Sequence, residues 1–97
     1  KNSYGLYIEN PKNGKNTFIT GDSVFNPDGF DFLYKSAHLI FNDCETGLGR
    51  SKVHSHIDDL RRLPKEYKEK MMLYHYGAKV EADEFKDFVN KGDIFEI

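Results

Sequence analysis

The sequence is poor in cysteine, because Cys44 is the one cysteine among 97 residues. A single cysteine cannot form a disulfide within the chain. It also excludes a zinc-finger site, which needs several thiolates or a Cys/His set at close spacing. No flanking cation favours its thiolate, so we expect Cys44 to be a small buried residue and not a nucleophile. A lone thiol fits a reducing compartment, and we therefore predict a cytoplasmic protein.

Long apolar runs and an excess of one charge are also missing. No segment approaches the roughly 18 to 20 apolar residues of a membrane-spanning helix, and the start, "KNSYGLYIEN", lacks the parts of a secretory signal. The 14 basic and 16 acidic residues are interspersed and give a formal net charge of −2. We predict no membrane partner and no general nucleic-acid affinity, which would require a basic patch.

What is present supports one small domain over residues 1–97. A hydrophobic content of 38% is enough for a single core and too little for two. The chain begins with Lys1 and enters a predicted strand within a few residues. We therefore expect it to be the C-terminal part of a longer polypeptide.

The apolar pattern predicts a layered α/β unit. Strands are predicted at residues 4–9, 17–20, 39–41, 71–74 and 93–97, with "FNPDG" as a loop. Helical segments are predicted at residues 30–37 and 83–91, and between them a turn or two at 57–63 is followed by a new helix that begins at Pro64 and continues through "KEYKEK". The predicted order is β-β-α-β-α-β-α-β. In α/β units of this kind, sites usually lie at the edge formed by the strand ends.

Two of the predicted strands are followed by possible metal ligands. Asp22 follows an apolar strand and Gly21, and His75 follows the apolar run Met71 to Tyr74. Each has an ordinary structural alternative: Asp22 could cap a turn, and His75 could hydrogen-bond to a neighbouring loop. The tyrosines that flank His75 are expected to pack rather than take part in chemistry.

A second pair of polar residues suggests proton transfer. Asp43 follows the strand at residues 39–41, and the next loop holds His54 and His56. A carboxylate that accepts a bond from one ring nitrogen fixes the tautomer and raises the basicity of the other nitrogen. Asp43 with His54 is the candidate acid and base pair, although His56 leaves the partner open. The alternative is a capping Asp43 beside solvent-exposed histidines.

Together these segments resemble the C-terminal half of the metallo-β-lactamase fold, as found in its phosphodiesterase and ribonuclease Z branch. The likeness is carried by "FITGDS", "HLIFNDCE", "VHSHIDDL", "MMLYHYG" and "VNKGDIFEI", in this order along the chain. The resemblance implies an αββα sandwich of which this chain forms half.

The same resemblance implies a dinuclear metal hydrolase. Asp22 and His75 are similar to the family's bridging and terminal metal ligands, and Asp43 with His54 to its proton-transfer pair. Two divalent ions, zinc first and iron or manganese as alternatives, would activate a hydroxide. The expected substrate is a small-molecule or nucleotide-type phosphodiester.

One motif of that family is absent. His-x-His-x-Asp-His, which supplies most of the metal ligands, does not occur in these residues. The chain alone is therefore expected to be inactive, and to form a homo-oligomer or pair with a missing N-terminal half. The alternative function is a non-catalytic interaction or assembly module derived from the same fold.

Overall fold

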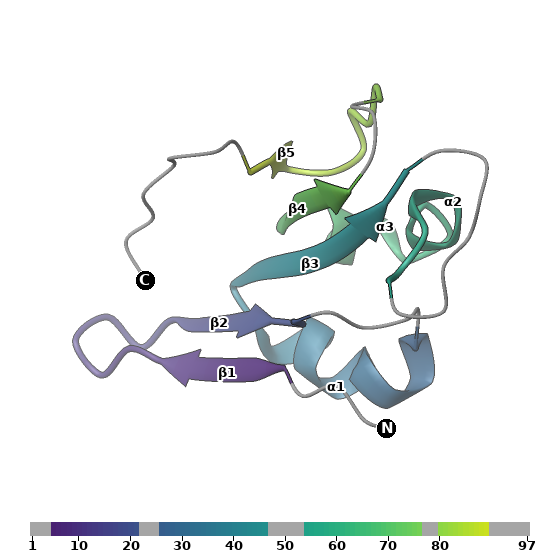
Figure 1. Ribbon diagram of the computed structural model, residues 1–97. Helices are drawn as coiled ribbons and strands as arrows, with labels where there is room; N and C mark the ends of the chain where they lie inside the picture. The colour runs from purple at the N-terminus through teal and green to yellow at the C-terminus, as the bar shows by residue number, and fades with distance from the viewer. Residues whose placement is uncertain (1–4, 22–25, 47–53, 77–79, 90–97) are drawn as a thin grey trace.

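The computed structural model describes residues 5–21, 26–46, 54–76 and 80–89, with the backbone alone at residues 75 and 76. These residues form a sheet of five strands in the order β1-β2-β3-β4-β5 (Figure 1). The first two strands pair antiparallel, and each later pair is parallel. A mixed α/β architecture, as predicted, is confirmed.

The first two strands form the predicted hairpin. β1 is Leu6–Glu9 and β2 is Asn16–Ile19, with Tyr7 opposite Phe18. In the turn, the N–H of Gly14 donates to the carbonyl of Asn10 at 2.8 Å. Gly14 has a φ of 70°, a conformation that glycine adopts without the steric cost that a Cβ brings.

Helix α1, Pro27–Ser36, begins three residues earlier than predicted, inside the stretch read as a loop. Pro27 stands at the start of the helix, where its missing N–H costs nothing. Asn26 caps the helix, because its side chain accepts the N–H of Gly29 at 3.1 Å. Pro27 and Gly29 were taken as breakers of a loop, but here they lie in the first turn of a helix.

The central strands are longer than their apolar runs. β3 is Leu39–Glu45 and β4 is Met71–Tyr76, and they pair in register with Ile40 beside Met71. Between them lie two short helices, α2 at Ile57–Leu60 and α3 at Lys65–Lys68. The sequence predicted a helical turn or two from Ile57 and a new helix beginning at Pro64, and the structure has such a break, with Pro64 at the N-cap position of α3.

One buried cluster joins the sheet to all three helices. Ile40 and Cys44 of β3 and Met71 and Leu73 of β4 belong to it. They occupy alternate positions, so they lie on one face of the sheet. The helices contribute Tyr34 from α1, Ile57 and Leu60 from α2, and Tyr67 from α3. The rings of Tyr34 and Tyr67 have centroids 5.6 Å apart.

The predicted helix at residues 83–91 is wrong for the part that the structure describes. Asp87 and Phe88 form strand β5, which pairs with β4. The side chain of Asp87 accepts the N–H of Phe88 at 2.8 Å, and the N–H of Lys86 donates to the carbonyl of Met71. These N–H groups are therefore used locally and in the sheet. The strand predicted at 93–97 lies outside the described residues.

Within the described ranges, no helix has the length and apolar character that crossing a membrane requires.

Candidate functional site

The carboxyl ends of β2, β3 and β4 meet at one edge of the sheet, because these three strands are parallel neighbours (Figure 1). In open α/β sheets this edge is the usual place for a small ligand. Asp43 lies near the end of β3, beside Tyr74 of β4. Asp43 and Cys44 are consecutive in β3, so their side chains point to opposite faces of the sheet. Cys44 faces the core beside the helices, and Asp43 therefore faces the other side.

The segment at residues 54–56 is held against the end of β3. The N–H of Glu45 donates to the carbonyl of Ser55 at 2.6 Å, and a parallel bridge joins Glu45 to His56. His56 also caps α2, since its Nδ1 accepts the N–H of Asp58 at 3.1 Å. These bonds explain why one histidine caps a helix and the other, His54, faces Asp43.

Asp43 and His54 come together as a hydrogen-bonded pair. His54 Nδ1 lies 2.9 Å from Asp43 Oδ2. The Asp43 side chain is fully buried, whereas 17% of the His54 side chain is exposed. A buried carboxylate is costly unless it is paired, and an ionised carboxylate only accepts hydrogen bonds, so the proton of this bond is on Nδ1. Nε2, across the ring, is the atom through which His54 could meet a ligand.

The backbone of Asp43 is fixed from both sides by residues that sequence reasoning missed. Its N–H donates to Thr20 Oγ1 at 3.0 Å, and its carbonyl accepts Asn42 Nδ2 at 2.7 Å. The buried hydroxyl of Tyr34 donates to Asn42 Oδ1 at 2.6 Å, and burial raises the pKa of that phenol. The available signal was the presence of two polar residues, Thr20 and Asn42, at the ends of apolar strands.

The turn after β2 is tied to the same edge. The hydroxyl of Tyr74 donates to the carbonyl of Gly21 at 2.9 Å and lies 3.3 Å from Thr20 Oγ1. Gly21 has a φ of 68°, which favours glycine. The hydroxyl of Tyr74 therefore positions the turn beside the Asp43 strand, and its taking no part in chemistry stays a prediction.

Cys44 points into the core, next to the site but on the other face. Cys44 is fully buried. Burial, as the larger cause, and the nearby Asp43 carboxylate together raise the pKa of its thiol to about 12. The prediction that Cys44 is buried is confirmed, and its raised pKa keeps the thiol protonated near neutral pH. That Cys44 is not a nucleophile stays a prediction.

The structure does not describe the side chains of the two predicted metal ligands, Asp22 and His75. Asp22 lies outside the described residues, and His75 is described by its backbone in β4 alone. Among the described side chains, no group of three or more His, Cys, Asp or Glu could hold a metal ion.

Comparison with known proteins identifies a family. The model of the family described as "Anti-Pycsar protein Apyc1" matches residues 1–95. Two curated relatives carry the same name, one from Bacillus phage vB_BsuM-Goe3 and one from Bacillus phage vB_BveM-Goe7. Each is 32% identical to this chain over 68 residues.

The alignment covers unequal shares of the two proteins. The alignment covers 66% of this chain but 26% of each relative. The chain therefore spans about a quarter of the length of the curated relatives that it matches.

These matches correct the interpretation drawn from the short motifs. The family is that of the anti-Pycsar proteins, in place of the metallo-β-lactamase-fold phosphodiesterase and ribonuclease Z branch. The prediction of a dinuclear metal hydrolase fragment with zinc, iron or manganese is corrected with it. The alternative of a non-catalytic assembly module does not match this family either.

The family match extends over nearly the whole sequence, including the site at the ends of β2, β3 and β4. Asp43, His54 and the residues that position them all fall inside the matched range. The chain belongs to the anti-Pycsar protein Apyc1 family.

Proposed function

We propose that this chain is part of a protein that acts against Pycsar, as the name of its relatives, anti-Pycsar protein, says of them. We further propose that it does so by engaging a small nucleotide-type molecule at the Asp43–His54 edge of the sheet. The observation that carries this proposal is the 2.9 Å bond between His54 and the buried Asp43.

The pair suits a phosphate-bearing ligand. Asp43 holds one ring nitrogen of His54, so the ring orientation is set before any ligand arrives. A fixed ring loses little conformational freedom on binding, which favours affinity. With Nδ1 bonded to Asp43, Nε2 is the ring nitrogen left to engage a phosphate group.

The surroundings support a small ligand over a polymer. The formal net charge is −2, whereas binding along a nucleic-acid backbone depends on many lysines and arginines acting together. A site at the ends of parallel strands, with one oriented histidine, fits a single nucleotide better.

Backbone amide NMR tests the proposal. The purified protein is titrated with a panel of linear and cyclic nucleoside monophosphates. We expect one of them to shift the amides of Asp43, Cys44 and Ser55 in a saturable way. His54→Gln should weaken this response about tenfold or more, the expected cost of losing a bond to a charged group.

The control is His38→Gln, which changes a histidine at the opposite edge of the sheet. This variant should leave the response at Asp43 and Ser55 unchanged, and well-dispersed spectra of both variants would show that they are folded. The proposal fails if no nucleotide shifts these amides, or if His54→Gln binds as tightly as the wild type.

A further inference from the structure

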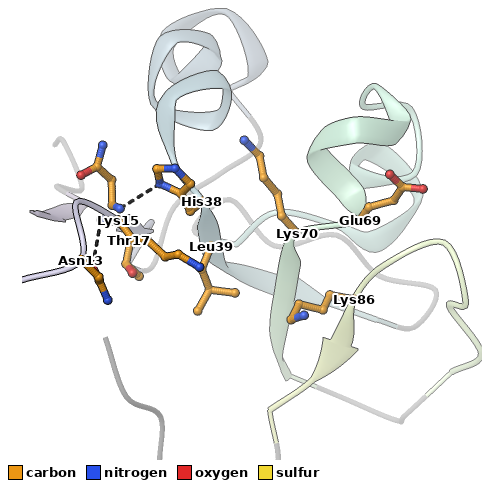
Figure 2. A pocket seen from close by; sticks show the side chains of 9 residues that line it. Asn13, Lys15, Thr17, His38, Leu39, Glu69, Lys70 and Lys86 are labelled. Atoms are coloured by element: carbon orange, nitrogen blue, oxygen red, sulfur yellow. Dashed lines mark hydrogen bonds between the residues drawn. The ribbon is translucent and has the colours of Figure 1, made fainter. Parts of the chain in front are cut away.

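A second polar feature lies at the other edge of the sheet, where the parallel strands begin. A pocket of about 290 Å³ opens there, lined by the residues that precede or start β2, β3, β4 and β5. Its charged and titratable lining residues are Lys15, His38, Glu69, Lys70 and Lys86 (Figure 2). This pocket is separate from the Asp43–His54 pair, which lies near the carboxyl end of β3.

The lining is positive although the whole chain is slightly acidic. The lining holds three lysines and a histidine, and its single carboxylate is that of Glu69. The carboxylate of Glu69 is also shared, because its Oε2 lies 3.7 Å from Nζ of Lys65. A concave surface with an excess of cations concentrates anions from solution.

His38 of the lining is held in one orientation by the start of β2. The ring Nδ1 of His38 accepts the backbone N–H of Asn16 at 3.0 Å. The backbone N–H of His38 donates to the carbonyl of Asn16 at 2.8 Å. A backbone N–H only donates, so Nδ1 carries no proton and the ring proton is on Nε2. The start of β2 thereby sets both the tautomer and the position of His38.

Lys70 is a fixed cation in the same pocket. Its Nζ donates to the carbonyls of Lys35 and Ala37 at the end of α1 and lies 5.8 Å from the ring centroid of Tyr67. Partial burial lowers the pKa of its ammonium group. Lys15 and Lys86 are exposed, so they supply charge without holding the fold together.

We propose that this pocket binds the phosphate group of a small molecule, with Lys15, Lys86 and Nε2–H of His38 as its contacts and Lys70 as a fixed positive charge. Lysine ammonium groups and an N–H donor match the acceptor oxygens of a phosphate. The inference goes beyond the proposed function and does not rest on it, because it concerns different residues at a different edge.

Amide NMR at constant ionic strength tests the inference with two probes, inorganic phosphate and adenosine 5′-monophosphate. Both should shift the amides of Asn16, Leu39 and Lys70 in a saturable way. The double variant Lys15→Ala, Lys86→Ala should weaken that response about tenfold, since two charge-assisted contacts are lost. Neither side chain is buried, so the variant should remain folded.

The matched control is Lys12→Ala, Arg62→Ala, which removes two exposed positive charges outside the pocket. It should bind both probes as the wild type does. Equal weakening in the two double variants would mean diffuse surface charge and would overturn the inference. So would the absence of any response to either probe. His54→Gln should leave this site intact, so the two proposals fail independently.

Discussion

At the residue scale, two neighbours in β3 show how one strand serves two purposes. Asp43 leaves the sheet to meet His54, and Cys44 points into the core among the helices. Alternation along the strand separates the two side chains. The Asp43 carboxylate nevertheless acts on its neighbour, because it adds to the effect of burial in raising the pKa of the Cys44 thiol.

The raised pKa of Cys44 predicts a loss of stability in alkaline solution. The thiol ionises near 9.0 in the unfolded chain and near 12 in the folded one. Between these values the unfolded chain binds fewer protons, so the free energy of unfolding falls as the pH rises. Below about pH 9 the thiol is protonated in both states, so its contribution to the free energy of unfolding is fully present.

Urea unfolding at several pH values from 8 to 10.5 checks this prediction. Cys44→Ala should be less stable than the wild type at pH 8 by about 1 kcal/mol, through lost packing. Its stability should then fall less steeply with pH than that of the wild type. Parallel curves for the two proteins would show that Cys44 does not titrate as described.

At the element scale, local signals decide where α1 begins. Asn26 caps the helix through Gly29, and Pro27 follows directly. Asn26→Ala should lower the free energy of unfolding by about 1 kcal/mol, the usual cost of losing a capping side chain. Asn26→Asp keeps an acceptor oxygen and should retain most of the stability. Thermal unfolding of both variants compares them, and equal losses would contradict a capping role.

The elements also show what the sequence can and cannot predict. The hairpin, α1, β3 and β4 were predictable because turn residues and apolar periodicity are local. The segment at residues 83–89 was not, because its N–H groups bond to Met71 and Leu73 of β4. Phe85 and Phe88 are buried as predicted, but in turn and strand conformations that only the neighbouring strand determines.

The candidate site, like the fold, was predictable only in part. Asp43 and His54 were found because each stands at the end or start of an apolar pattern. Thr20, Asn42 and Tyr74 were not, because their roles depend on bonds across strands and between distant parts of the chain. The short motifs also led to a family that the full comparison corrects.

At the scale of the whole molecule, the sheet presents two chemically different edges. The carboxyl ends of the parallel strands carry the Asp43–His54 pair, and the amino ends carry the lysine-lined pocket. The chain spans about a quarter of its curated relatives, so the activity of the whole protein stays a proposal. Self-association, expected from the sequence, also stays a prediction.

The most direct test of the central claim is action against Pycsar in living cells. Wild-type protein, His54→Gln and, as a control, Arg62→Gln, an exposed residue outside both proposed sites, are expressed at equal levels in bacteria that carry a Pycsar system, and the inhibition of that system is measured. The account predicts that the wild type and Arg62→Gln inhibit it equally and that His54→Gln loses the effect. Full inhibition by His54→Gln would contradict the assignment of function to the Asp43–His54 edge.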